Sequence, residues 1–192
     1  PDLFKKVFPA RVPGAIMLNT IKRWLERILE IVSISLLITM AVIVVLAVIF
    51  RFLGKSLIWY DEVASVVLAW LTYYGSALAV IHRGHLGFTG LFLKLPKQLR
   101  AAAFVTAETV VISFFALVGY AGWYLLGIFG EETLVSLNWV PLSFTLSVIP
   151  IGSSLFIIAE ILSIPDAWRK AMAGIDYEKE MMDQAIEEAS QS

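Results

Sequence analysis

Few ionisable residues lie within the long apolar segments of this chain, and they are the first candidates for chemistry because an unpartnered charge is unstable in lipid. Asp61 and Glu62 begin one apolar segment, soon after Arg51 ends the preceding one. This spacing predicts an ion pair that holds the two segments together, with the acids also well placed at a helix amino terminus. A direct part in substrate handling is the alternative.

Glu108 is the deepest carboxylate of the sequence, seven residues beyond the start of an apolar segment at Ala101. The only basic residue at helical spacing is Arg100, which lies further out. Two interpretations remain open. Glu108 is either a structural carboxylate that is hydrogen-bonded to a neighbouring helix or partner subunit, or a group that couples proton or ion movement to transport.

His82 and His85 lie three residues apart in one loop. They therefore cannot supply the two axial ligands of a haem from facing helices, and two histidines without a third ligand make a poor metal site. Cysteine is absent, which excludes disulfides and thiol chemistry. We predict no catalytic residue, no cofactor and no metal, and we expect the histidines to order their loop.

Pro150 and Gly152 stand near the middle of another apolar segment, with several serines beside them. Broken helices bind solutes in some transporters, which carry matching breaks in two paired halves. No matching break occurs elsewhere in the sequence. The pattern therefore predicts a simple kink at Pro150, with a binding site as the alternative.

These residues belong to four apolar segments in a chain of 192 residues, of which 59% are hydrophobic. Each segment can cross a hydrocarbon core of about 30 Å as a helix, which satisfies its own backbone hydrogen bonds in lipid. The expected spans are residues 28–50, 59–81, 101–129 and 141–164. The predicted fold class is an all-α integral membrane protein with four transmembrane helices. A net charge of -1 gives no reason to expect nucleic-acid binding.

Basic residues are distributed unevenly between the segments that flank the spans. Six precede the first span, four lie in the middle loop and three in the tail, whereas the other two loops hold only Arg51 and Lys55. Basic loops stay in the cytoplasm, so both termini are expected there, in a bacterial inner membrane. Trp59 and Trp139 then fall at the outer membrane boundary, where tryptophan is favoured, and Trp70 lies deep in a span.

Two flanking segments differ from the spans. Within the amino-terminal segment 1–27 and the start of the first span, residues 17–32 alternate apolar and charged positions at helical spacing. This pattern predicts an amphipathic helix that lies on the inner leaflet and turns into the first span. The carboxy-terminal segment 165–192 is acidic and is expected to form a loose cytoplasmic tail.

Small residues recur at helical spacing in the second and third spans. In the third span they are Ala116, Gly119 and Gly122. Such seams let helices approach closely, without showing whether the partner is the same chain. The seam of the second span consists of Ser65, Ala69, Thr72, Ser76 and Ala79.

Residues 51–89 resemble a known family, and the resemblance extends over about residues 22–169. The sequence is similar to the small permease subunit (DctQ-type) of tripartite ATP-independent periplasmic (TRAP) transporters. In that pattern an Arg ends the first span, a Trp and acids open the second, and a His follows it. At Thr89 the family often has an acid. The matching residues are Arg51-Phe52, Trp59-Tyr60-Asp61-Glu62, Trp70, Gly75-Ser76-Ala77 and Arg83-Gly84-His85-Leu86-Gly87.

The resemblance implies an accessory subunit that binds no substrate alone. A periplasmic substrate-binding protein would deliver an organic acid, of dicarboxylate or sialic acid type, to a large multi-span permease subunit driven by a sodium gradient. Arg51, Asp61 and Glu62 would fix the outer rim, Trp59 and Trp139 would anchor it, and the second and third spans would face the partner. The alternative is a self-sufficient oligomeric transporter or channel that uses Glu108 and the Pro150 region.

Overall fold

The computed structural model describes residues 13–82 and 95–173, and these residues are almost entirely helical. Five helices are present: α2 (Pro13–Phe52), α3 (Tyr60–Ile81), α5 (Lys97–Phe129), α6 (Leu142–Leu146) and α7 (Val148–Ala173). Four candidate membrane spans follow from them, at Thr20–Phe52, Tyr60–Ile81, Lys97–Phe129 and Leu142–Arg169. The predicted fold class, all-α with four membrane-spanning helices, is confirmed.

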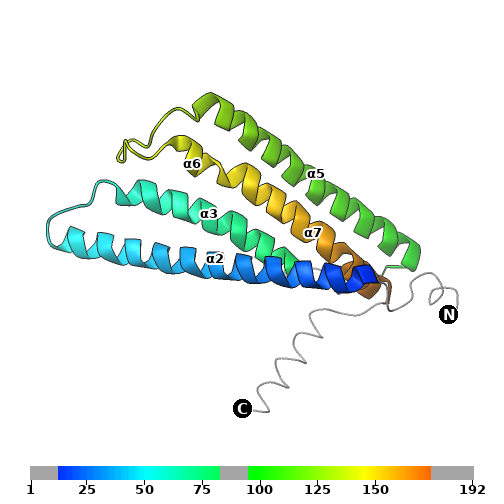
Figure 1. Cartoon of the computed structure of the whole chain (residues 1–192). Coiled ribbons are helices and arrows are strands. Elements are labelled where there is room, and N and C mark those ends of the chain that lie inside the picture. The colour runs from blue at the N-terminus through cyan, green and yellow to red at the C-terminus, as the bar shows by residue number, and fades with distance from the viewer. Residues whose placement is uncertain (1–12, 83–94, 174–192) are drawn as a thin grey trace, which may run out of the picture.

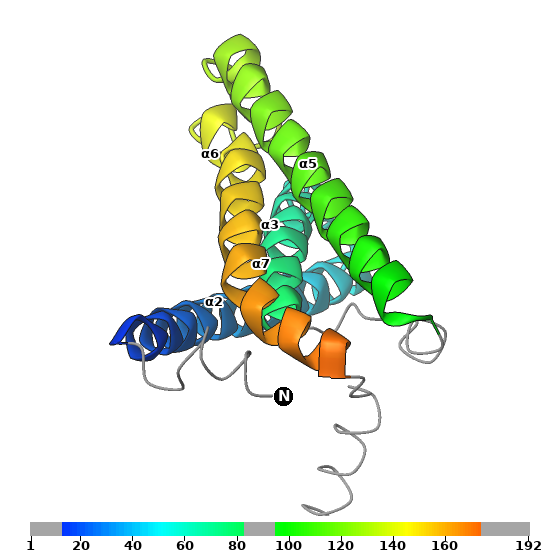
Figure 2. The same ribbon diagram turned by 90° about the vertical axis from the view of Figure 1, so that its right-hand side faces the viewer.

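The helices form a row rather than a closed bundle (Figure 1). α7 packs against both α3 and α5, and α3 packs against α2, so the spatial order is α2, α3, α7, α5. Figure 2 shows α2 and α5 on opposite sides of the two central helices. The row has two ends, which we call the basic end (residues 20–30, 80–82, 95–104 and 164–173) and the hairpin end (residues 52–60 and 130–142).

The first helix differs from its predicted form. α2 is one uninterrupted helix of 40 residues, so the turn expected between an interfacial helix and the first span is wrong. At about 1.5 Å per residue the helix is roughly 60 Å long, twice a hydrocarbon core. It ends where Gly54 adopts a positive φ of 72° and the amides of Leu53 and Lys55 bond back to α2 carbonyls.

The fourth span also differs from its predicted form, because it consists of two helices. The chain breaks at Ser147, between α6 and α7, and α7 then continues past the expected end at Ile164 to Ala173. Pro150 explains the position of the break, since a proline ring has no N–H and collides with the carbonyl four residues earlier. The break therefore lies three residues before the proline, and a change of helix direction there stays a prediction.

The buried core is small and lies toward the basic end. The main cluster joins Leu29 of α2, Ala77 of α3 and Phe156 of α7, and the Phe115 ring of α5 stacks on Phe156 at a centroid distance of 3.5 Å. A second cluster joins α5 to α7, where Phe104 meets Trp168 edge to face at 5.4 Å. Most of each helix surface therefore remains outside the core.

Candidate functional site

Glu62 connects the first turn of α3 to the loop between α5 and α6. Its Oε1 accepts a hydrogen bond from the amide of Val135 at 2.8 Å, and its Oε2 accepts one from the amide of Ser136 at 2.8 Å. The Ser136 hydroxyl donates to the same Oε2. One carboxylate thus receives three donors from two adjacent residues of a distant loop.

The loop is also ordered by its own backbone. The amide of Leu134 donates to the Val140 carbonyl at 3.1 Å, and the amide of Leu142 donates to the Glu132 carbonyl at 2.7 Å. Leu134 is buried beneath the loop, whereas Val135 and Trp139 are 91% and 80% exposed. The hairpin end therefore exposes two large apolar side chains on a loop whose backbone is held both by Glu62 and by its own hydrogen bonds.

The predicted ion pair of Arg51 with Asp61 or Glu62 is wrong. Arg51 is exposed at the end of α2, and no ion pair joins it to either acid in the part of the chain that the structure describes. Glu62 faces the α5–α6 loop instead. Asp61 lies exposed beside it, and its backbone carbonyl accepts the Ser65 hydroxyl at 2.7 Å.

Replacing Glu62 by alanine is expected to loosen the α5–α6 loop, because the amides of Val135 and Ser136 then lose their acceptor. Hydrogen exchange at these two amides should accelerate strongly, which mass spectrometry of the loop peptide measures. Asp61→Asn is the matched control, since the exposed Asp61 side chain is one position away and does not hold the loop. Equal exchange in the two variants would show that Glu62 does not order the loop.

Trp70 supports the break between α6 and α7. Its indole Nε1 donates to the Thr145 carbonyl at 3.3 Å, and its ring lies 4.9 Å from that of Phe144. Hydroxyl groups satisfy two further α6 carbonyls, since Thr145 Oγ1 donates to Leu142 and Ser147 Oγ to Phe144. Backbone groups at a break in a span need such partners. These contacts favour a structural role for the break over a solute-binding role, because the chain's own side chains satisfy the backbone groups there.

The small-residue seam of α3 lies largely on the open side of the helix. Ser65 and Thr72 are exposed, Ala69, Ser76 and Ala79 are half-buried, and the two exposed hydroxyls bond back within α3. At Gly75 nothing lies within 4 Å of a Cβ position. Within the described chain, this face is therefore not the close contact between α3 and α7.

The close contacts of α7 with α5 and α3 are made at glycines of α5 and of α7 itself. A Cβ at Gly119 of α5 would lie 3.3 Å from Ser153 Cβ, so the helix that approaches this seam residue is α7, a partner that the sequence left open. A Cβ at Gly122 would meet Ile149 Cγ2 at 2.5 Å, and one at Gly152 would meet Tyr73 Cβ of α3 at 2.6 Å. The sequence pattern places Gly152 in a kink or, alternatively, in a binding site; in the structure Gly152 lets α3 and α7 approach closely.

Glu108 and Glu160 lie within the third and fourth spans, and the chain buries them to different degrees. Glu108 of α5 is half-buried, whereas Glu160 of α7 is only 5% exposed. The coupling role of Glu108 stays a prediction. Within the described ranges, no three His, Cys, Asp or Glu side chains come together as a metal site. His85 lies outside the described residues.

Polar contacts that the sequence did not predict hold the basic end together. Lys22 of α2 pairs with Asp166 of α7 at 3.5 Å, and Glu26, one turn later, lies 3.3 Å from the His82 imidazole at the end of α3. Asp166 also accepts a hydrogen bond from Arg169 at 2.7 Å. Adjacent turns of α2 thus contact two different helices. The sequence could not predict these pairs, because the partners lie far apart along the chain.

Arg100 joins the start of α5 to the end of α7. The guanidinium is buried and donates to the Ala171 carbonyl at 3.2 Å and to the Leu95 carbonyl at 3.1 Å. Carbonyls in the last turn of a helix lack intrahelical donors and carry partial negative charge, so a cation stabilises them. Arg100 is therefore a cap for α7 supplied by another helix.

Known proteins resemble this chain over much of its length. A family model described as "Tripartite ATP-independent periplasmic transporters, DctQ component" matches residues 40–170, more than half of the chain. A TRAP transporter small permease protein of Haemophilus influenzae is 27% identical over 104 residues, which cover 53% of this chain and 65% of the relative. The family is a transporter component rather than an enzyme family. With its four apolar helices, the chain belongs to the DctQ family of TRAP small permease components and is a multi-pass inner-membrane protein.

Proposed function

We propose that this chain is an accessory scaffold subunit that acts with a large multi-span permease subunit and a periplasmic substrate-binding protein. The assembly imports organic acids of dicarboxylate or sialic acid type and is driven by a sodium gradient. The match of residues 40–170 to the small-component family carries this proposal. Substrate binding and ion coupling belong to the other two proteins.

The arrangement of the helices supports a scaffold role. In their most apolar stretches the four spans have 17%, 17%, 6% and 28% of their residues fully buried within the chain. Many side chains, above all those of α2 and α5, are therefore left for lipid or another protein. A row of helices gives a broad footprint and two wide faces. Such a shape suits a chain that enlarges and steadies a bigger membrane subunit.

The orientation proposed from basic residues places the basic end in the cytoplasm and the hairpin end in the periplasm. Ordered Val135 and Trp139 would then lie where a binding protein arrives. A cysteine at exposed Ser56 should react with an impermeant maleimide in intact cells, and one at exposed Gln98 only in opened cells; these 192 residues contain no other Cys. The reverse labelling pattern would contradict this orientation.

The function is tested by reconstitution of purified components in liposomes. We expect the tagged chain to co-purify with the large permease, and uptake of a labelled organic acid to require both subunits, the binding protein and an inward sodium gradient. Liposomes with the chain alone should show no uptake. Uptake by the chain alone would instead support the self-sufficient transporter that uses Glu108 and the Pro150 region.

A further inference from the structure

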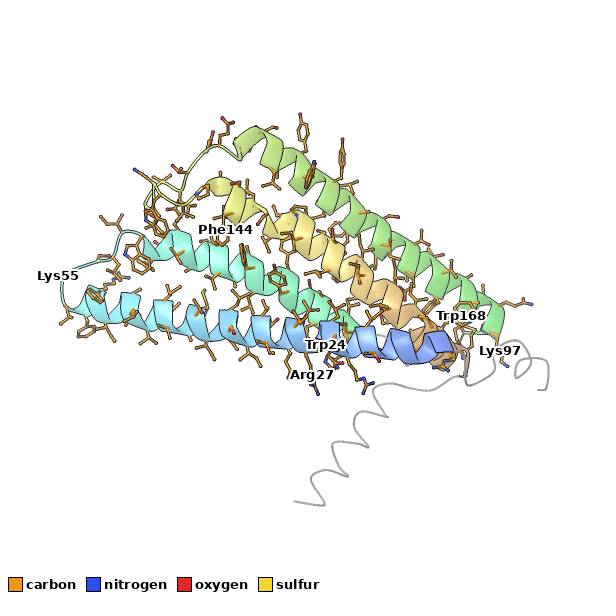
Figure 3. All side chains as sticks on the ribbon, in the orientation of Figure 1. Trp24, Arg27, Lys55, Lys97, Phe144 and Trp168 are labelled. Atoms are coloured by element: carbon orange, nitrogen blue, oxygen red, sulfur yellow. The ribbon has the colours of Figure 1, made fainter. Side chains whose placement is uncertain are left out.

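The basic end of α2 carries a cation that the fold does not use. Lys22 and Glu26 point toward the other helices and are engaged by Asp166 and His82. Arg27 points the other way and is exposed, and no ion pair engages it in the described chain. Figure 3 shows Arg27 and Trp24 together on the side of α2 that faces away from α3 and α7.

This outward face of α2 changes along its length from charged, with Arg27 and its exposed neighbour Glu30, to aliphatic. Trp24 is 68% exposed, Arg27 follows it after three residues, and Ile28 and Ile31 are 52% and 66% exposed on the same face. The opposite face contains Leu29, which is 1% exposed. The exposed stripe continues through Ile38, Val42, Val45 and Ile49 to the hairpin end.

The uncharged part of α2 places the transition from charged to aliphatic side chains at the membrane boundary. A hydrocarbon core of about 30 Å takes about 20 helical residues, which residues 31–50 provide. Arg27 and Trp24 then lie within the next two turns, at the level of the lipid headgroups. Arginine binds phosphate through a planar fork of donors, and tryptophan prefers this same level.

We propose that Trp24 and Arg27 form a binding site for an acidic phospholipid of the inner leaflet. The guanidinium binds the phosphate, the indole lies beside the glycerol, and the acyl chains lie along Ile28, Ile31 and the stripe beyond them. Lipid fits this face better than a soluble anion does, because exposed aliphatic side chains without a charge follow Arg27 and Glu30 from Ile31 onward. The site rests on the proposed orientation and not on transport activity.

The test uses the full chain, delipidated in detergent and titrated with phosphatidylglycerol or phosphatidylcholine, with bound lipid counted by native mass spectrometry. Wild type should prefer phosphatidylglycerol. Arg27→Gln should weaken its binding about fivefold, in line with one cation near an anionic surface, and should leave phosphatidylcholine unchanged. Arg27→Lys should retain most of the preference.

Lys97→Gln is the matched control, since Lys97 is an exposed cation at the same end but lies on α5, which α3 and α7 separate from α2. An equal loss in Lys97→Gln and Arg27→Gln would overturn the proposal, because binding would then follow total charge alone. Unchanged lipid binding in Arg27→Gln, with loss of co-purification of the large permease, would also overturn it and assign this face to protein. Retained co-purification with reduced phosphatidylglycerol binding would support it, whatever the uptake assay shows.

Discussion

Replacing Gly152 by alanine is expected to force α3 away from α7 and to destabilise the chain by about 1–3 kcal/mol. The new Cβ would lie 2.6 Å from Tyr73 Cβ and 3.0 Å from two atoms of the Tyr73 ring. A Cβ atom is fixed to the backbone, so no rotation of Tyr73 relieves the contact. One of the two central helices must therefore move.

Gly75→Ala is the control for this prediction. Gly75 is also a helical glycine of the central pair, but nothing lies within 4 Å of its Cβ position. Alanine there should leave stability unchanged or raise it by up to about 1 kcal/mol, because alanine favours the helix. Unfolding in mixed micelles, followed by circular dichroism, measures both variants. Equal midpoints would show that the contact at Gly152 does not set the helix spacing.

Replacing Arg100 by methionine is expected to destabilise the basic end by about 3 kcal/mol, since two hydrogen bonds from a charged donor are lost. The carbonyls of Ala171 and Leu95 then lose a donor in a buried place. Arg100→Lys should recover only part of the loss, because an ammonium group lacks the fork that reaches two acceptors.

The same unfolding assay and limited proteolysis after α7 test the Arg100 prediction. Lys97→Met serves as the control, because Lys97 is exposed one turn earlier in α5 and should change stability by less than about 0.5 kcal/mol. If Arg100→Met unfolds at the same denaturant fraction as Lys97→Met, Arg100 is not a cap for α7.

The four spans could be predicted because length and apolarity alone decide which segments cross a bilayer. The packing role of Gly119 followed from its spacing, and the family from residues between Arg51 and His85. The partner of Glu62 could not be predicted in this way. The charge of Glu62 indicated the nearby Arg51 as a partner. In the folded chain Glu62 instead accepts hydrogen bonds from the amides of Val135 and Ser136. Every residue except proline has such an amide, so the sequence does not show which amides will be the donors.

Local rules also left the geometry of the fourth span open. A proline predicts disturbed helical hydrogen bonds, and the break indeed precedes Pro150. The rule does not say which side chains fill the break. Trp70 does so from another helix, and Gly152, beside the proline, serves the contact with Tyr73. These pairings depend on how the helices are arranged, which the local pattern does not contain.

The small core has a consequence for how this protein evolves. Only 6% of the residues in the most apolar stretch of α5 are fully buried by its own chain, so most positions there need only be apolar enough for contact with lipid or another membrane protein. Leucine, valine and phenylalanine can replace one another there at little cost. Substitutions should therefore accumulate quickly over most of the chain and slowly at the few glycines and polar residues that hold the helices together. The relative with 27% identity fits this expectation.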